Sequence, residues 1–576
     1  MYPLLTSGIP DNPRNKKVLE AVRAAAEEYE KEDIKDLPFS KYRIYFETGS
    51  RLEYEACYIE HRRRLNVYAA MALSSGKEKW VKGLEDILWA ICDEYTWAFP
   101  AHIKDWTDVG ESRITVDLFA CETGLALSET CHLLGERLHA TVRRRVEKEV
   151  RARLITLYRE RRLTFHKDNW SAVCAGSIGM SVLYWGGLEE YRQIEEKVMA
   201  SMEDFLGSYQ DDGCCLEGAL YWGYGFGYFC YFAAMLRAYT GGKTDLFARE
   251  KVKQIALFRQ KVYLEKNVVV PFADAPHNYS CHIGLLHFLA KEYEEVEVPQ
   301  EECGAWFDDD IRHRFADFMR DFYWYDPQLK QTASPRGKCV FSQSQWYFDR
   351  RERYFFGAKG GRNNEPHNHN DIGHFIIYSQ GKFILDDLGW PEYDGDYFGE
   401  RRYENICAAS AGHSVPIIGG LEQERGREHC SRWMKYVENE VSFDLTAAYP
   451  EGSCQSLVRT FDIRENGIRL TDSIKGVKGN IRERFVTRIA PDRKEGCVWI
   501  GDWRIKSLVP AEEIQITERD FKPRLDICKM DMKPLEKAYL IDFVICPGAG
   551  SVEAAFEITE KAASVDTGAE NNPQFF

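Results

Sequence analysis

Apolar residues recur every three to four positions along about the first 330 residues, which is the period of amphipathic helices. Between Glu55 and Leu73, for example, the residues at helical spacing are Ile59, Leu65, Ala69, Ala70 and Leu73, and Ser74-Ser75-Gly76 follows as a stop signal. The same period predicts further helices over 80–92, 114–134, 138–163, 170–185, 193–205, 221–239, 245–262 and 280–293. These segments share no fixed sequence repeat, so helix pairs that close into an α/α toroid are favoured over a stacked solenoid.

After about Pro335 the pattern changes to short β-rich runs separated by turn residues. Glu465-Asn466-Gly467, between two alternating runs, is a strong hairpin signal. Strands are predicted over 338–342, 346–348, 354–358, 374–378, 383–385, 415–418, 458–464 and 468–474. The chain is therefore predicted to be an α+β multidomain protein, with a helical domain over 1–335, an antiparallel β-sheet domain over 336–576, and a boundary near Ser334-Pro335-Arg336-Gly337.

Composition narrows the class of protein. With 576 residues, 44% hydrophobic and 29% charged, the chain is long enough for two or three folded domains. Its net charge of −15 argues against nucleic acid as a partner, because phosphate binding needs a basic surface. No apolar run near ~20 residues and no secretory signal are visible, so we expect no membrane span and a cytoplasmic location. The 17 cysteines form no Cys-x-x-Cys pair and are expected to be reduced thiols.

The densest chemical cluster is the segment Asn363–Asp371. His367, His369 and Asp371 alternate there, so an extended strand would place them on one face, where imidazole and carboxylate can converge on a metal ion. Farther on, Asp386-Asp387 ends an apolar run and His413 begins another, which completes a credible metal-ligand set. From these residues alone, a polar surface loop and, for His413, a satisfied core histidine remain open.

Three motifs follow one another in the C-terminal half: His367-Asn368-His369-Asn370-Asp371, Leu385-Asp386-Asp387-Leu388-Gly389 and Gly412-His413-Ser414-Val415. Together they resemble the C-terminal signature of the heparinase II/III family of polysaccharide lyases. Two helical segments are also similar to that family: Asp168-Asn169-Trp170-Ser171-Ala172-Val173-Cys174, which departs from it at Asp168, and Asp212–Gly225. The resemblance implies an α/α toroid followed by an antiparallel β-sandwich, and β-elimination of uronic-acid-containing glycans.

The resemblance also implies roles for individual residues. Such an elimination needs a group that offsets the substrate carboxylate, a base at C5 and an acid at the leaving O4. The implied catalytic residues are Asn169, Tyr221 and His367, and the candidate substrate-binding residues are Trp170, Glu217, Tyr224 and Arg362. Without the resemblance, the aromatic members of these sets would be assigned to the helix core. Arg362 is a candidate source of the positive charge that Tyr221 would need to act as a base.

The implied metal ligands are His369, Asp387 and His413. Asp387 is preferred to Asp386 because it stands two residues before Gly389, as the family motif requires. Zinc is the first choice for such a ligand set and manganese the second, and the ion is expected to organise the structure. Strand periodicity would instead place His367 and His369 on one ion together.

Alternatives remain at this point. A glycoside hydrolase on the same scaffold would need two opposed carboxylates, for which Asp211, Asp212 and Glu217 are candidates. A non-catalytic glycan-binding protein is the other alternative. The expected partner is an anionic polysaccharide or oligosaccharide, such as heparan sulfate, chondroitin, hyaluronan or alginate. The sequence leaves open a homodimer, the C5 epimer and endo against exo action.

Overall fold

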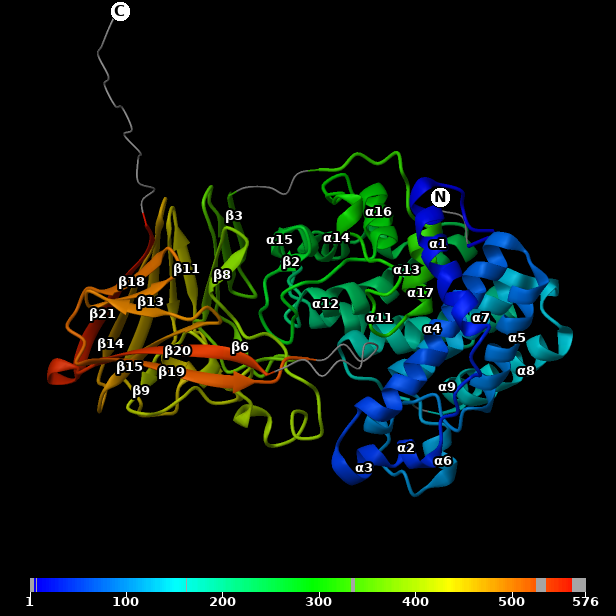
Figure 1. Cartoon of the computed structure of the whole chain (residues 1–576), viewed down its shortest axis with the longest axis horizontal. Coiled ribbons are helices and arrows are strands. Elements are labelled where there is room, and N and C mark those ends of the chain that lie inside the picture. The colour runs from blue at the N-terminus through cyan, green and yellow to red at the C-terminus, as the bar shows by residue number, and fades with distance from the viewer. Residues whose placement is uncertain (1–4, 7, 162, 333–336, 525–534, 562–576) are drawn as a thin grey trace, which may run out of the picture.

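The computed structural model describes residues 5–6, 8–161, 163–332, 337–524 and 535–561. Figure 1 shows a helical domain beside a domain of layered antiparallel sheets, so the predicted fold class is confirmed. Among the described residues the last α-helix ends at Tyr323, and the first strand of the β domain begins at Gly337. The predicted boundary itself falls largely on residues 333–336, outside the described residues.

The helical domain contains the predicted helices and five further α-helices. Its α-helices are α1 (Pro13–Tyr29), α2 (Phe39–Tyr42), α3 (Ile44–Thr48), α4 (Leu52–Ser75), α5 (Glu78–Asp93), α6 (Val109–Arg113), α7 (Leu118–Leu134), α8 (Ala140–Val150), α9 (Thr156–Glu160), α10 (Gly176–Tyr191), α11 (Glu195–Ser208), α12 (Ala219–Tyr221), α13 (Gly227–Tyr239), α14 (Glu250–Ala256), α15 (Phe258–Val262), α16 (Ile283–Glu292) and α17 (Phe315–Tyr323). The five that lie outside the predicted ranges are α1, α2, α3, α6 and α17. Three π-helical turns interrupt this pattern: η3 (Arg151–Ile155), η4 (Ser171–Ala175) and η5 (Trp222–Phe226). A small hairpin of β1 (Tyr263–Glu265) and β2 (Val268–Val269) was not predicted.

One helical run, Ser171–Tyr191, is long and apolar enough by length and composition to cross a membrane. Within the fold, 72% of its apolar window is buried among the other helices. A core helix passes the same test, so the run lends no support to a membrane span.

The β domain consists mainly of three antiparallel sheets. Their orders are β3-β4-β5-β7-β8, β19-β20-β15-β9 and β11-β12-β13-β14-β21-β18-β17-β16. The strands are β3 (Gly337–Phe341), β4 (Trp346–Arg350), β5 (Phe355–Lys359), β7 (Phe375–Ser379), β8 (Lys382–Leu385), β9 (Ile417–Ile418), β11 (Met434–Val437), β12 (Glu440–Asp444), β13 (Ser456–Arg464), β14 (Gly467–Lys475), β15 (Ile481–Thr487), β16 (Asp492–Lys494), β17 (Cys497–Ile500), β18 (Trp503–Ser507), β19 (Glu513–Phe521), β20 (Glu536–Ile545) and β21 (Ser551–Glu560), with β6 (Arg362–Asn363) and β10 (Gly426–Cys430) forming a separate pair. The predicted Glu465–Gly467 turn joins β13 to β14.

The sheet that contains β4 joins the two domains because side chains alternate between its faces. Trp346 and Phe348 belong to the core of the helical domain, whereas Tyr347 belongs to the core of the sandwich. Phe272 from the helical domain meets Trp346 edge to face at 5.3 Å. This apolar contact fixes the position of the cleft between the domains.

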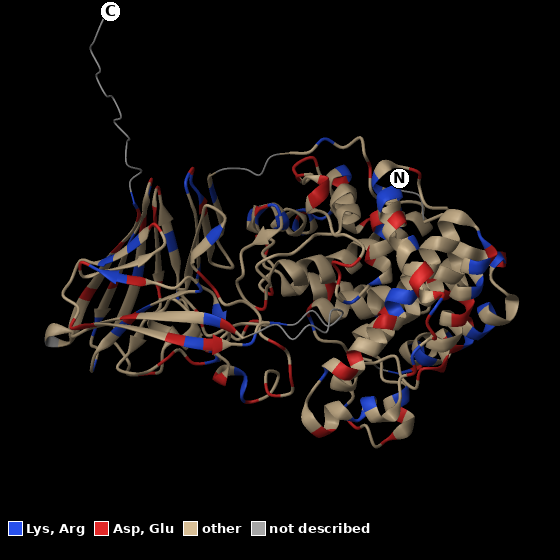
Figure 2. Cartoon of the chain, viewed as in Figure 1, with Lys and Arg blue, Asp and Glu red and all other residues tan. Residues whose placement is uncertain are grey.

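A polar contact reinforces the joint. The Asp212 carboxylate accepts hydrogen bonds from the backbone amides of Gln343 and Ser344 at 2.9 Å each. Asp212 is therefore used to hold the domains together, which removes it from the carboxylate pair that a hydrolase would need. Acidic and basic residues are interspersed over both domains in Figure 2, so the net negative charge is not gathered on one domain.

Candidate active site and metal group

Two π-helical turns follow the two helical-domain candidates. Asn169 lies two residues before η4, and Tyr221 immediately precedes η5. The two segments approach closely because Gly225 has no side chain: a Cβ there would lie 2.8 Å from the Cβ of Asn169. Widened turns of this kind shift the register of the side chains that follow, and they are frequent at functional sites.

The β domain contributes the loop between β6 and β7, which carries both histidines of the His-x-His motif. This loop is not the extended strand that the alternation suggested. His367 adopts a left-handed backbone conformation, with φ of 56°. His367 lines the cleft, whereas His369 is completely buried behind it. The alternative that strand periodicity offered, with both histidines on one ion, therefore does not match the structure, in which the possible metal group contains His369 without His367.

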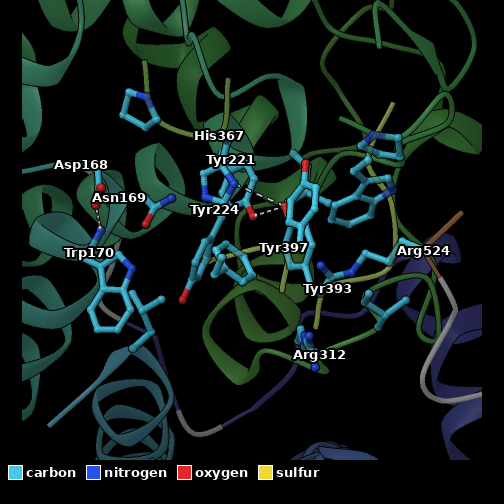
Figure 3. Close-up of a pocket in the computed structure, with 18 of the residues that line it drawn as sticks. Asp168, Asn169, Trp170, Tyr221, Tyr224, Arg312, His367, Tyr393, Tyr397 and Arg524 are labelled. Atoms are coloured by element: carbon cyan, nitrogen blue, oxygen red, sulfur yellow. Dashed lines mark hydrogen bonds between the residues drawn. The ribbon is translucent and has the colours of Figure 1, made fainter. Parts of the chain in front are cut away.

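A cavity of about 1170 Å³ lies between the domains and is lined by residues of both. Asn169, Trp170, Tyr221 and Tyr224 come from the helical domain, and His367 comes from the β domain. Figure 3 shows these side chains around one opening. The structure therefore brings all three predicted catalytic residues to one site.

Tyr221 and His367 meet across the domain boundary. Their rings stack with centroids 4.2 Å apart and an interplanar angle of 26°. The Tyr221 hydroxyl lies 3.1 Å from the hydroxyl of Tyr393. Burial raises the pKa of Tyr221, Asp274 raises it further, and Arg524 opposes the rise. Tyr221 is accordingly a neutral phenol in this structure.

Asp274 is completely buried and hydrogen-bonds several residues of the site. It accepts hydrogen bonds from Nδ1 of His367 at 2.7 Å, from Nε2 of His369 at 3.0 Å and from the Tyr393 hydroxyl at 2.8 Å. Burial alone would raise the pKa of this carboxyl, but Arg402 and the histidine hydrogen bonds hold it well below its usual range. Because Asp274 is ionised, both imidazoles donate to it, and in the neutral form of His367 this leaves the lone pair on Nε2.

Asn169 is oriented by Glu217, since its side-chain amide donates a hydrogen bond of 2.9 Å to the Glu217 carboxyl. Nε2 of His367 lies 3.7 Å from the same carboxyl oxygen. Burial raises the pKa of Glu217 to about 7; His367 opposes this rise, whereas Asp168 and Asp274 add to it. Glu217 lies beneath the cavity wall, so it acts on the site through Asn169.

The other predicted substrate-binding residues differ in position. Trp170 and Tyr224 line the cavity, and the Tyr224 hydroxyl contacts the carboxylate of Glu122. Arg362 is exposed and does not belong to the cavity lining, and its guanidinium donates a hydrogen bond to the backbone carbonyl of Arg427 at 3.4 Å. The structure therefore does not place Arg362 beside Tyr221; the charges of Arg524 and Arg51 are the ones that interact with Tyr221 there.

Behind the cavity, a completely buried group could hold a metal ion. It contains His369, Asp387 and His413, the three predicted ligands, together with Asp371, and their candidate ligand atoms all lie within 4.8 Å of one another. Asp371 is already engaged, because the ammonium of Lys359 lies 2.7 and 2.9 Å from its two oxygens.

Hydrogen bonding within the group fits a cation. His369 donates Nε2–H to Asp274, and His413 donates Nδ1–H to the Ala409 carbonyl at 2.8 Å. The remaining nitrogens face each other at 3.2 Å, and the neighbouring Oδ2 of Asp387 has no hydrogen-bond partner among the described residues. Two imidazole nitrogens on a tetrahedral ion at ~2.0–2.1 Å stand about 3.3 Å apart, so the donor set suits such an ion.

Asp386 differs from the neighbouring Asp387 because its carboxylate has partners outside the metal group. It lies 2.8 Å from Nε2 of His277 and 2.6 Å from Nε of Arg488. Both of its oxygens are thereby engaged away from the metal group.

Sequence reasoning missed four residues of the site: Asp274, Tyr393, Tyr397 and Arg402. No local pattern marks them, because their partners lie far away along the chain. The one available signal was the density of aromatic and charged residues over 390–403, between two of the recognised motifs.

Comparison with known proteins gives a family match for the C-terminal part and similar structures for the whole chain. Residues 335–509 match the family model described as heparinase II/III-like, C-terminal. The chain is similar to a heparinase III structure, with 12% identity over 96% of this chain and 92% of that chain and a TM-score of 0.61. It is similar to a mutant heparan sulfate lyase from Pedobacter heparinus, with 13% identity over 97% of this chain and 84% of that chain and a TM-score of 0.59. It is also similar to a chondroitin AC lyase from Streptomyces coelicolor, with 11% identity over 96% of this chain and 80% of that chain and a TM-score of 0.54. No curated protein matches the sequence. At these identities the structural similarity establishes the fold.

Proposed function

We propose that this chain, whose residues 335–509 match the heparinase II/III-like C-terminal family model, is a polysaccharide lyase that cleaves uronic-acid-containing glycans by β-elimination. The observation that carries the proposal is the stack of Tyr221 on His367, at 4.2 Å, inside the cavity between the domains. Each residue comes from a different domain, and each offers a proton-transfer group to the same space.

The base in this proposal is His367. Its Nδ1–H donates a hydrogen bond to the ionised Asp274, so in the neutral imidazole Nε2 presents a lone pair on the other side of the ring. A carboxylate behind an imidazole fixes the tautomer and stabilises the imidazolium that forms when the ring accepts the C5 proton. Tyr221, a neutral phenol, is the acid that protonates the departing O4.

The group that offsets the substrate carboxylate is the amide of Asn169. Its Nδ2 donates one hydrogen to Glu217 and has a second hydrogen for the substrate. A protonated Glu217 keeps this corner of the site free of a competing negative charge. The intermediate formed at C5 is a dianionic aci-carboxylate, so a fixed donor at this position lowers its free energy.

The proposed metal ligands are His369, Asp387 and His413, with zinc as the ion and manganese as the second choice. Bound there, the ion would cross-link the loop that carries His367 to the strands behind it. The residues that touch substrate in this proposal are separate from the ligands, because the metal group is completely buried.

The test is to incubate the purified protein, with zinc or manganese, with a panel of polyuronates and glycosaminoglycans and their oligosaccharides. Elimination creates a C4–C5 double bond conjugated with the carboxylate, so ultraviolet absorbance should rise with time. Substrates that differ only in C5 configuration would show which epimer is used. Cleavage without the chromophore would identify a hydrolase, and saturable binding without cleavage would identify a glycan-binding protein; either result would overturn the proposal.

A further inference from the structure

Three of the arginines that line the same cavity lie close enough to one another for their charges to interact. They are Arg51 at the start of α4, Arg312 before α17 and Arg524 after β19. Figure 3 shows Arg312 and Arg524 on one side of the stacked rings and Asn169 on the opposite side. The cluster is thus assembled from both domains, as the catalytic pair is.

The positive charge of this cluster is only partly compensated. Glu55 lies between two of the arginines, 2.5 Å from Nε of Arg51 and 2.7 Å from Nη1 of Arg312. Burial opposes the ionisation of Glu55, but the two arginines lower its pKa to about 2. Among the described residues, no other carboxylate lies within ion-pair distance of the three guanidinium groups. One carboxylate against three guanidinium groups leaves two positive charges facing the cavity.

Arg524 is the least satisfied member of the cluster. Its guanidinium lies over the rings of Trp390 at 4.5 Å and Tyr393 at 4.0 Å, contacts that orient its plane but accept no hydrogen bond. Its Nη1 is buried and has no hydrogen-bond partner among the described residues. A buried, unpaired N–H group of a charged side chain is costly, so its presence at a cavity wall indicates a partner that arrives with the ligand.

We infer that Arg51, Arg312 and Arg524 form a second anion subsite, which binds an oxyanion of the substrate beyond the carboxylate held at Asn169. The inference rests on the proposed function for its ligand: the oxyanion is a sulfate ester or the carboxylate of a neighbouring uronate. Guanidinium groups bind both in the same forked geometry, so the chemistry of the site is common to the two sources.

The subsite is tested directly with inorganic sulfate, by isothermal titration of the full chain at constant ionic strength. We expect sulfate to bind the unaltered chain and Arg524→Gln to weaken that binding about 10- to 100-fold. Arg524→Lys keeps the positive charge but lacks the forked guanidinium, so it should retain part of the sulfate affinity. This variant tests the subsite if Arg524→Gln fails to fold. Arg469→Gln, at an exposed position of β14, is the matched control and should bind like the unaltered chain. Absent binding, or equal binding by Arg524→Gln, overturns the inference.

Turnover then distinguishes the two sources of the oxyanion. A rise in KM of Arg524→Gln confined to sulfated uronate oligosaccharides identifies a sulfate ester, and a rise on unsulfated polyuronates identifies a carboxylate. Unchanged KM on both overturns the subsite and leaves the lyase proposal standing. If sulfate binding depends on Arg524 but the protein has no lyase activity, the subsite stands and the lyase proposal is overturned.

Discussion

Asp274 of the helical domain accepts a hydrogen bond of 2.7 Å from Nδ1 of His367 in the β domain. The other oxygen of the same carboxylate accepts a hydrogen bond from His369. A single buried side chain therefore fixes the tautomer of the proposed base and orients a proposed metal ligand. This arrangement links the cavity to the metal group behind it and makes both depend on how the domains meet.

Replacing Asp274 with Asn should therefore impair both functions. The amide has one acceptor oxygen where the carboxylate has two, and its NH2 group would face histidine N–H donors. We expect kcat and metal affinity each to fall about 10- to 100-fold. Product absorbance measures the first and elemental analysis of the purified variant measures the second.

Asp349→Asn is the control for this substitution. Asp349 is a buried carboxylate of β4 that pairs with Arg351 and lies outside the cavity lining. Loss of both properties in Asp274→Asn, with both retained in Asp349→Asn, is the expected result. Full activity and full metal content in Asp274→Asn would contradict the linking role.

Tyr221→Phe removes the proposed acid and leaves the aromatic ring in its stack on His367. Proton transfer by a positioned side chain is worth about 10²- to 10⁴-fold, so kcat should fall by about that factor. Substrate affinity, measured by titration calorimetry, should change little. Tyr436→Phe, at an exposed position of β11, should leave turnover unchanged. Turnover by Tyr221→Phe at the unaltered rate would remove Tyr221 from the chemistry.

The fold could be predicted from the sequence because each domain has its own hydrophobic period. The period of 3.6 residues around Ile59 and Leu65 predicted α4, and the alternation on either side of Glu465–Gly467 predicted the β13–β14 hairpin. Local periodicity does not specify π-turns such as η4 and η5, since their extra residue depends on how neighbouring helices pack.

The candidate site was predictable where its residues stand in recognisable motifs and not elsewhere. Strand periodicity does not apply to His367, because its backbone is left-handed and the loop is not an extended strand. Asp274 was missed because its partners are more than 90 residues away, and its own surroundings in the sequence are ordinary. Arg362 was assigned from its proximity to the motif, whereas Arg524, from the other end of the domain, occupies the place beside Tyr221.

Asp387 and Asp386 provide a comparison within one dipeptide. Asp387→Asn should abolish metal binding, because a neutral amide replaces the only carboxylate of the proposed ligand set. Asp386→Asn should retain the metal, since its carboxylate is engaged by His277 and Arg488 outside the group. Elemental analysis after dialysis, together with thermal unfolding with and without added zinc, measures both. Equal metal content in the two variants would show that the site is not the one proposed.

Glu217 should make substrate binding depend on pH. Its pKa of about 7 means that the carboxyl is largely neutral below pH 7 and becomes an anion above it, next to Asn169. The charges that face it are those of Asp168, Asp274 and His367. A substrate carboxylate at Asn169 is repelled by the ionised form, so KM should rise with pH. If only the protonated form binds, KM at pH 8 should be about tenfold higher than at pH 6. Glu217→Gln, which is neutral at every pH, should flatten this dependence while keeping an acceptor for the Asn169 amide. The KM profiles of both proteins between pH 6 and pH 8 measure the difference, and an equally steep rise in Glu217→Gln would place the titrating group elsewhere.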